Sequence, residues 1–344
     1  MQQDNEHSDI SITVVIPVYN RAEQCREAVK SAHEAISGLN AEIVVVDDGS
    51  DDNVAGAVGD FARVERIAHS GMPGRARNVA VERSSGTHVA FLDSDDLWYQ
   101  DKIRKQLPRI VSGARMVHCR ERWIRDGGEV SQRSHRHKRR GDIFKDALTK
   151  CIVGPSTFVI ERALFEMSGG FREDMRVAED YELALRLLAF EKIDYVDVPL
   201  VEKRDHAGPQ LSHTYPHIEG FRIRALGDVL ADMIEAQALS GDAARDGHAG
   251  LMNIVEAIDG VAAFHGENSQ GRCFPRTRWG TMSPASVDTW RIVSAAGEYA
   301  RKCRIFANGA SKRGREDEAG IHRFAADSLE NTCYSSLAIA GGTV

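Results

Sequence analysis

Short apolar runs and longer helix-type stretches alternate over the first hundred residues of the chain. Four apolar, largely β-branched runs predict buried strands, at residues 12–17, 42–47, 64–68 and 87–93. Residues 22–37 place apolar side chains on one helical face, and further helices are expected up to about Ala62 and over residues 75–84. This alternation predicts a mostly parallel, Rossmann-like sheet with helices on both faces, the α/β class.

The pattern is less regular between residues 100 and 205. We expect helices at 100–112, 162–167 and 178–191, and strands at 115–123, 156–160 and 193–198, the last ended by Pro199. Beyond residue 215 the pattern is helical, at 218–239 and roughly at 289–306. Residues 241–288 are rich in Gly, Ser, Asp and Asn and are expected to be partly irregular. The tail from Ser311 is charged, then small and apolar, and is expected to fray.

Composition narrows the class of protein. The 344 residues are 42% hydrophobic and 28% charged, which is typical of a globular protein with a sizeable core. The net charge of −7 does not indicate a nucleic-acid partner. No run of 18 apolar residues is present, and the polar stretch 1–9 lacks a signal-peptide core, so a cytoplasmic location is expected.

Polar residues follow three of the predicted strands. Tyr19 to Arg21 follow the first, Asp47 and Asp48 end the second, and Asp93 to Asp96 end the fourth. Ligands of parallel α/β sheets bind outside the carboxyl ends of the strands. We therefore expect these side chains to share one binding site.

Asp93 and Asp95 are two carboxylates at a spacing of two, directly after a buried strand. Such a pair can ligate a hard divalent cation, and a diphosphate can supply further ligands. The alternative is a turn followed by a helix N-cap, because Asp96, Leu97 and Trp98 could start a helix. The polar ends of the neighbouring strands favour the metal site.

Asp48 and Tyr19 are candidates for contact with a nucleotide. The Asp48 carboxylate can accept hydrogen bonds from a base or a ribose, and it can also cap the helix after Gly49. A tyrosine at a strand end can stack on a base, although an ordinary strand-to-helix turn explains it equally well. Arg77 and Asn78 follow a Gly-Pro-Gly-type loop and can reach phosphate oxygens, unless they lie on a solvated helix face.

Glu179 and Asp180 open a predicted amphipathic helix after the turn at Gly169 and Gly170. A carboxylate at a helix N-terminus is stabilised as an anion, which suits a general base that faces a cleft. Simple N-capping is the alternative. The basic run 131–140, which contains His137, suits a loop that closes over a diphosphate, or a solvated surface loop.

Five motifs in order now resemble glycosyltransferase family 2. They are IPVYNR at 16–21, VVVDDGS at 44–50, ARN at 76–78, FLDSDDLW at 91–98, and GGF through AEDYELALR over 169–186. The resemblance covers about residues 10–215. It implies the GT-A fold and inverting transfer of one sugar from a nucleotide-diphosphate sugar, by family habit a UDP-sugar, to a hydroxyl of a glycan or lipid-linked acceptor, a step of polysaccharide biosynthesis.

The resemblance also assigns roles to single residues. Asp180 matches the catalytic base, and Asp95 with Asp93 matches the DxD motif that holds Mg²⁺ or Mn²⁺, with His206 as a further metal or diphosphate contact. The donor-binding candidates are Pro17, Tyr19, Arg21, Asp48, Arg77, Asn78, Asp93 and Ser94. The acceptor or loop candidates are Glu179, His137 and Gln210.

The expected organisation follows from this match. Residues 1–9 are predicted to be disordered and 10–215 to form the catalytic domain, with a nucleotide-binding half at 10–100 and an acceptor half at 101–215. A helical region at 216–310, with the irregular insertion 241–288, and a flexible tail at 311–344 complete the chain. A lipid-linked acceptor would bring peripheral membrane association.

Two other functions compete with sugar transfer. A nucleotidyltransferase needs a Gly-rich N-terminal phosphate loop, which IPVYNR does not provide. A non-catalytic nucleotide-sugar-binding protein on the same fold is the other alternative, and the presence of every key carboxylate argues against it. The QxxRW motif of processive synthases is absent, since Pro275 stands where the glutamine should precede Arg278 and Trp279, so polymerisation is not expected.

Overall fold

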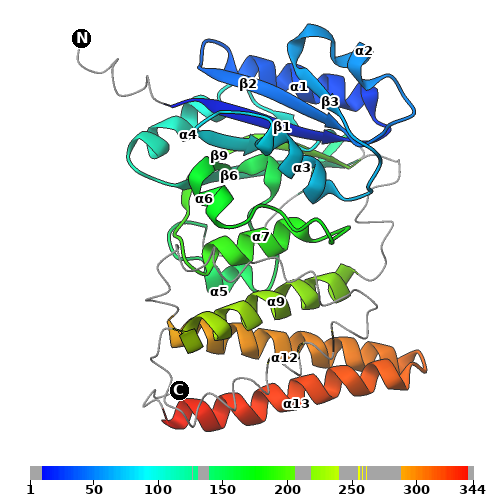
Figure 1. Cartoon of the computed structure of the whole chain (residues 1–344), viewed down its shortest axis with the longest axis vertical. Helices are drawn as coiled ribbons and strands as arrows, with labels where there is room; N and C mark the ends of the chain where they lie inside the picture. Colours follow the sequence, from blue (N-terminus) through cyan, green and yellow to red (C-terminus); the bar gives the residue numbers. More distant parts are fainter. Residues whose placement is uncertain are drawn as a thin grey trace. The chain divides into compact units, whose positions relative to one another are not determined.

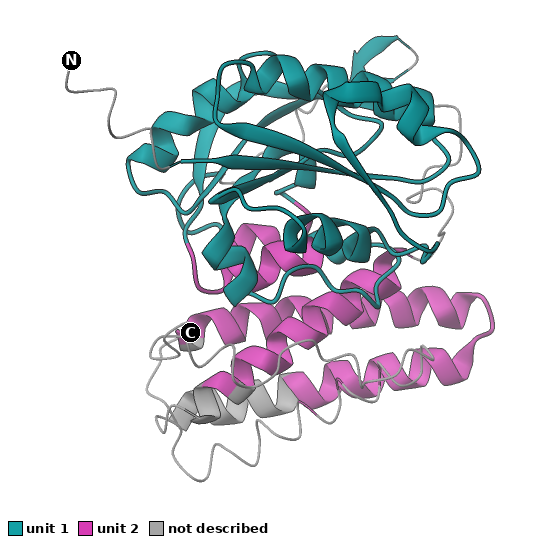
Figure 2. Cartoon of the chain, turned by 45° about the horizontal axis from the view of Figure 1, so that its top comes forward, with its two compact units in different colours: residues 1–143, 152–180, 192–214 teal, residues 144–151, 181–191, 215–344 magenta. Residues whose placement is uncertain are grey.

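A computed structural model describes residues 10–125, 127–130, 139–205, 218–239, 255, 258, 261 and 288–339. The chain divides into two compact units, coloured separately in Figure 2. The first, the sheet unit, comprises residues 1–143, 152–180 and 192–214. The second, the helical unit, comprises residues 144–151, 181–191 and 215–344.

The sheet unit is built on a mixed sheet in which the described residues form nine strands (Figure 1). The strands are β1 (Ile12–Val18), β2 (Ala41–Asp47), β3 (Arg63–Arg66), β4 (His88–Phe91), β5 (Leu97–Trp98), β6 (Met116–Arg125), β7 (Gly128–Val130), β8 (Val159–Glu161) and β9 (Asp194–Asp205). Their order is β3-β2-β1-β4-β8-β6-β9-β5, with β7 paired to β6. The first four are parallel, as predicted, whereas β8 joins the sheet antiparallel to both β4 and β6. The sheet is therefore parallel in its first half and mixed in its second.

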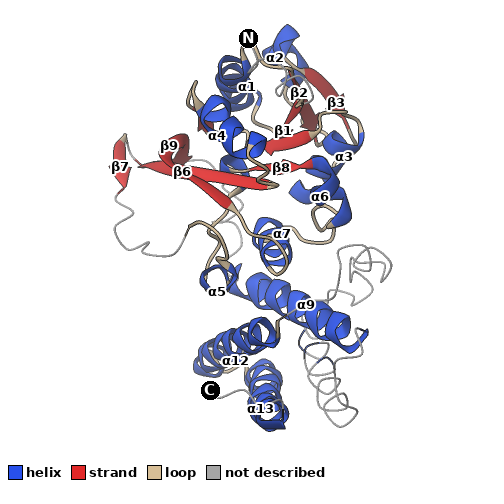
Figure 3. Cartoon of the chain, turned by 90° about the vertical axis from the view of Figure 1, so that its left-hand side faces the viewer, coloured by secondary structure: helices blue, strands red, loops and turns tan. Residues whose placement is uncertain are grey.

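Helices cover both faces of this sheet. The helices and 3₁₀ turns of the two units together are α1 (Ala22–Ile36), α2 (Val54–Val58), η1 (Gly59–Phe61), α3 (Pro73–Glu82), α4 (Lys102–Val111), α5 (Phe144–Ala147), η2 (Pro155–Thr157), α6 (Arg162–Met167), α7 (Glu179–Leu188), α9 (Ile218–Leu239), α12 (Thr289–Lys312) and α13 (Glu316–Ile339). Figure 3 shows α1 and α4 on one side of the sheet and α3 and α6 on the other. Each covering helix buries an apolar stripe, as in α1, whose Cys25, Ala28, Val29 and Ala32 are at most 1% exposed.

One expectation for the second half of the sheet is wrong. The strand at 193–198 does not stop at Pro199 but continues to Asp205, because β6 pairs with it along its whole length. Arg120 of β6 pairs with Pro199 at a shift in the register of the two strands. The regular ladder of hydrogen bonds is interrupted there, so the chain tolerates a proline, which has no N–H. The alternative of a helix that starts at Asp96 does not hold either, because Leu97 and Trp98 form the short strand β5, and α4 begins at Lys102, within the predicted helix at 100–112.

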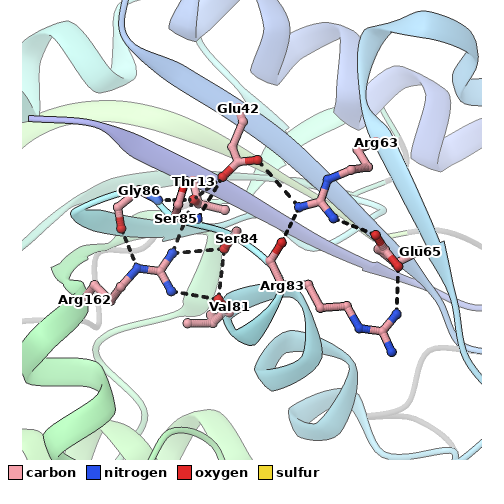
Figure 4. A network of polar contacts seen from close by, with 10 residues as sticks. All are labelled: Thr13, Glu42, Arg63, Glu65, Val81, Arg83, Ser84, Ser85, Gly86 and Arg162. Carbon is pink, nitrogen blue, oxygen red and sulfur yellow. Dashed lines mark hydrogen bonds and ion pairs between the residues drawn. The ribbon is translucent and has the colours of Figure 1, made fainter.

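The amino ends of the strands carry a structural polar network (Figure 4). The Arg162 guanidinium donates to the carbonyl oxygen of Val81 at 2.7 Å and to the Ser84 hydroxyl at 3.0 Å, which satisfies the last turn of α3. Thr13, near the start of β1, donates to Glu42 and accepts from the Gly86 N–H. Because these groups satisfy one another, this edge of the sheet serves stability, and the opposite edge carries the candidate site.

The helical unit contains the long helices α9, α12 and α13, and Figure 1 shows α12 and α13 side by side. The buried residues that α12 presents at helical spacing are largely small, including Ala295, Ala296, Ala307 and Ala310, which permits close helix packing. A Schellman motif ends α12: Gly314, at φ 73°, donates to Ser311, and the Arg315 N–H donates to Ala310.

The prediction of a flexible tail from residue 311 is wrong over most of its length, because residues 316–339 form the regular helix α13. Its first turn carries Glu316, Asp317 and Glu318, which favour a helix N-terminus. Its Ala325, Ala326 and Leu329 are at most 1% exposed. Within the described residues, no helix is long and apolar enough to cross a membrane.

Candidate active site

The three polar strand ends lie next to one another, as the alternation of strand and helix predicts. Strand β1 lies between β2 and β4, with Val18 paired to Asp47 and Val15 paired to Phe91. The residues that follow these strands therefore leave the sheet at one edge. Pro17 fits this position because proline has no N–H. Strand β4 leaves β1 after Phe91, so a backbone N–H at position 17 would have no strand partner on that side.

The loop after β1 is fixed by hydrogen bonds to the loop after β2. Asn20 adopts φ 51°, a left-handed conformation that asparagine tolerates well. Its backbone N–H donates to the Ser50 hydroxyl at 2.9 Å, and its side chain accepts from the Asp51 N–H at 2.7 Å. This arrangement leaves the Tyr19 ring 42% exposed and stacked on His69, with ring centroids 4.1 Å apart.

Asp48 is held by the loop that precedes α3. Its carboxylate accepts from the Ser70 N–H, the Ser70 hydroxyl and the Gly71 N–H, each at 2.9 Å. Gly49 permits this approach, because its φ is 76° and a Cβ there would lie 2.8 Å from the His69 backbone nitrogen. Asp48 does not cap α2, since the Asn53 side chain accepts from the Gly56 N–H in that role.

The aspartates after β4 have three different environments. Asp93 accepts from Arg77 at 2.7 Å, and Asp95 forms an ion pair with Arg21. Asp96 is 4% exposed and accepts from the Ser156 hydroxyl at 2.6 Å, while the Ser156 oxygen in turn accepts from the Asp93 N–H. Asp96 therefore supports the loop from inside and is not a helix cap.

Electrostatics separate these carboxyls further. Burial, reinforced by the charges of Asp93 and Asp95 and opposed by Lys203, raises the pKa of Asp96 to about 8. Burial alone would raise the pKa of Asp93, but Arg77, Lys203 and Arg21 together lower it. Asp93 is therefore the carboxylate that stays ionised, and Asp96 is the one that retains a proton near neutral pH.

Arg77 joins the loop after β4 to the first turn of α7. Its side chain is 6% exposed, and it donates to Asp93 Oδ1 and Glu179 Oε1, both at 2.7 Å. Its guanidinium carbon lies 5.0 Å from the centroid of the Phe171 ring. The neighbouring Asn78 donates to the Phe171 carbonyl oxygen and accepts from the Phe171 N–H, both at 2.9 Å. The ARN segment therefore contacts the protein's own loops.

Glu179 and Asp180 form the first turn of α7, as predicted, and Ala178 enters that turn at φ 66°. A non-glycine residue in this region is strained by roughly 1–2 kcal/mol, and such strain occurs often at functional sites. Glu179 is buried, whereas Asp180 is partly exposed. Burial, opposed by Arg77 and reinforced by Asp180, raises the pKa of Glu179 to about 7.

The raised pKa of Glu179 predicts a pH-dependent stability. Its pKa is about 7 in the folded protein and 4.5 in the unfolded chain, so the folded state binds more protons between these values. The free energy of unfolding should therefore fall from pH 4.5 to pH 7, by on the order of 2 kcal/mol from this residue. Urea unfolding at pH 5 and pH 8 should show a smaller loss in Glu179→Gln than in the unsubstituted protein. Equal losses would contradict the assignment.

A divalent cation fits the chemistry of Asp93 and Asp95. Across the described ranges, no three His, Cys, Asp or Glu side chains converge as a ready metal cage. Mg²⁺ and Mn²⁺ sites often use only one or two carboxylates, and substrate phosphates and water complete the coordination. Both carboxylates already attract guanidinium groups, from Arg77 and Arg21, so this loop favours positive charge.

The remaining candidates divide into two groups. His137, His206 and Gln210 lie outside the described residues, and their roles stay predictions. Ser94 is 6% exposed beside Asp93.

Sequence reasoning missed Ser156, His69 and Lys203. The pKa of Lys203 is raised by Asp96, Glu121, Asp93 and Asp180, against the effect of its burial. Of these, His69 had a sequence signal, its place in the loop between a strand and α3.

The sheet and its acidic carboxyl edge define an α/β protein of the kind that binds nucleotides at strand ends. The family model for glycosyl transferase family 2 matches residues 13–168. A putative teichuronic acid biosynthesis glycosyltransferase of Bacillus subtilis, TuaG, is 30% identical over 186 residues, which cover 52% of this chain and 71% of that protein. The chain belongs to glycosyltransferase family 2.

Other relatives extend this comparison. An uncharacterized glycosyltransferase of Rickettsia conorii is 31% identical over 206 residues, which span 58% of this chain but only 34% of that longer protein. The Escherichia coli glucosyltransferase WfgD is 25% identical, over 66% of this chain and 88% of that protein. A crystal structure of S. aureus TarS with UDP-GlcNAc superposes with a TM-score of 0.59 at 18% identity, over 94% of this chain and 92% of that one. This likeness shows the GT-A-type fold, including the helical C-terminal region.

Proposed function

We propose that this chain is an inverting, metal-dependent glycosyltransferase. It moves one sugar from a nucleotide-diphosphate sugar to a hydroxyl of a glycan or a lipid-linked glycan. The observation that carries this proposal is the Arg77 bridge, which ties Asp93 at the carboxyl edge of the sheet to Glu179, next to Asp180. A donor held at Asp93 therefore lies close to a partly exposed carboxylate at a helix N-terminus.

The nucleotide is proposed to bind across the ends of β1 and β2. Tyr19 offers an exposed ring for stacking, Asp48 offers a fixed carboxylate, and Pro17 and Ser94 border the same edge. The names of two similar proteins support a UDP-sugar donor, since WfgD is a UDP-Glc-dependent enzyme and TarS was crystallised with UDP-GlcNAc. The name of WfgD also supports an undecaprenol-diphosphate-linked acceptor, which would bring the enzyme to a membrane surface.

Asp95 and Asp93 are proposed to hold Mg²⁺ or Mn²⁺ against the donor diphosphate. When bound, the cation neutralises the charge that develops on the leaving diphosphate. Arg21 and Lys203 add positive charge to the same loop.

Asp180 is the proposed general base. It accepts the proton of the acceptor hydroxyl while that oxygen attacks the anomeric carbon and the bond from this carbon to the diphosphate breaks. A direct displacement inverts the anomeric configuration, and one carboxylate is sufficient for it. Glu179 is less suited to this role, because it is buried and its carboxylate is bound to Arg77.

Binding and turnover together test this function. UDP with Mn²⁺ should stabilise the protein in thermal unfolding, and a panel of nucleotide-sugars should identify the donor by the largest shift. The selected donor should then be consumed with an undecaprenol-linked or glycan acceptor. Failure to bind any nucleotide would refute the proposal. Binding of UDP without turnover of any donor would favour a non-catalytic nucleotide-sugar-binding protein.

A further inference from the structure

We propose that Arg77 is a positioning residue that sets the place of Asp180 through Glu179, and that it does not bind the donor phosphates. This inference rests on the proposed function of the site. It assigns to the arginine of the ARN segment a role different from the phosphate contact that the sequence pattern suggests.

Both terminal nitrogens of Arg77 are used inside the protein. One lies 2.7 Å from Glu179 Oε1 and the other lies 2.7 Å from Asp93 Oδ1. The remaining nitrogen, Nε, is buried and has no hydrogen-bond partner, so the head group is enclosed. With its side chain 6% exposed and its guanidinium near the Phe171 ring, Arg77 presents little accessible surface to a phosphate.

The two ends of the bridge are themselves fixed. A Cβ on Gly74, in the first turn of α3, would lie 2.4 Å from the Arg172 carbonyl oxygen, so α3 packs directly against the loop that leads to α7. Asn78 binds the same loop through Phe171 and Glu173. On the other side, Ser156 accepts from the Asp93 N–H. The bridge therefore connects two well-supported segments, the loop after β4 and the first turn of α7.

Charge explains how the bridge can respond to the donor. A single guanidinium is shared by two carboxylates, and a cation that approaches Asp93 competes with Arg77 for that carboxylate. Arg77 then interacts more strongly with Glu179. Loss of the arginine should free Asp93 for a cation, whereas loss of a phosphate ligand would weaken nucleotide binding.

The test separates binding from turnover. UDP affinity with Mn²⁺ is measured by calorimetry, and kcat and KM are measured with the selected donor, for Arg77→Gln, Glu179→Ala and the double variant. Arg77→Gln should keep the UDP affinity within about threefold, or tighten it, and lower kcat about 100-fold, because a displacement of about 1 Å in a catalytic group has that effect. Arg83→Gln is the matched control, at the exposed C-terminal end of the same helix.

The double variant shows whether Arg77 acts through Glu179. If it does, the double variant should lose no more kcat than the more impaired single variant. If the kcat losses of the two single variants multiply in the double variant, the inference is overturned. It is also overturned if Arg77→Gln weakens UDP binding more than about 30-fold and leaves kcat unchanged. If Arg77→Gln does not fold, Glu179→Ala removes the same bridge from its other end, and an unchanged kcat in that variant overturns the inference. An active parent protein with normal variants refutes only this inference, whereas an inactive parent protein refutes the proposed function as well.

Discussion

Replacement of Asp180 by asparagine is expected to lower kcat by about a thousandfold and to leave UDP affinity within a few fold. A general base typically contributes between about 10² and 10⁴ to the rate, and asparagine keeps the shape of aspartate but accepts no proton. The nucleotide is proposed to bind across β1 and β2, so its affinity should not depend on this side chain. Initial rates at saturating donor, with calorimetry of UDP and Mn²⁺, measure the two effects separately.

Asp197→Asn is the control for this substitution. The Asp197 side chain is 72% exposed and pairs with Arg120 at the surface, so its loss should leave both kcat and UDP affinity unchanged. If Asp180→Asn retained more than about a tenth of the parent kcat, Asp180 would not be the base. If UDP affinity fell with kcat, the substitution would have disturbed the donor site.

Replacement of Asp95 by asparagine should give the second large effect, a loss of about a thousandfold in kcat/KM. A catalytic cation contributes several kcal/mol of charge stabilisation, and each 1.4 kcal/mol corresponds to a factor of ten. Mn²⁺ should also enhance UDP binding less in this variant than in the parent protein. Titration of Mn²⁺ at fixed UDP, followed by calorimetry, measures that enhancement without turnover.

Asp96→Asn is the matched comparison within the same loop. Asp96 retains a proton near neutral pH and accepts a hydrogen bond from Ser156, and the asparagine oxygen can accept the same bond. Its Mn²⁺ dependence should therefore equal that of the parent protein. Equal losses in Asp95→Asn and Asp96→Asn would indicate damage to the loop and not the loss of a metal ligand.

The sequence by itself determined the sheet of the nucleotide-binding half and the edge on which the site lies. Parallel strands are buried on both faces, so they appear as continuous apolar runs, and β1, β2 and β4 lie within about two residues of their expected positions. Asp48, Asp93 and Asp95 directly follow such runs, and their place at the carboxyl edge is therefore a local property of the chain. The start of α7 at Glu179 is local in the same sense.

Only the tertiary structure decided how these side chains are used. Arg77 binds Asp93, 16 positions away, and Glu179, 102 positions away. Ser156 accepts from the N–H of Asp93, which lies 63 positions before it in the chain. The extension of β9 past Pro199 depends on pairing with β6, and the α13 helix packs on α12 where the charged and small-residue sequence suggested a loose tail. Periodicity reports which face of an element is buried, but it carries no information on which distant segment covers that face. That packing determines the partners of each buried charge. The partners in turn determine the protonation state and the contacts of each carboxylate in the site.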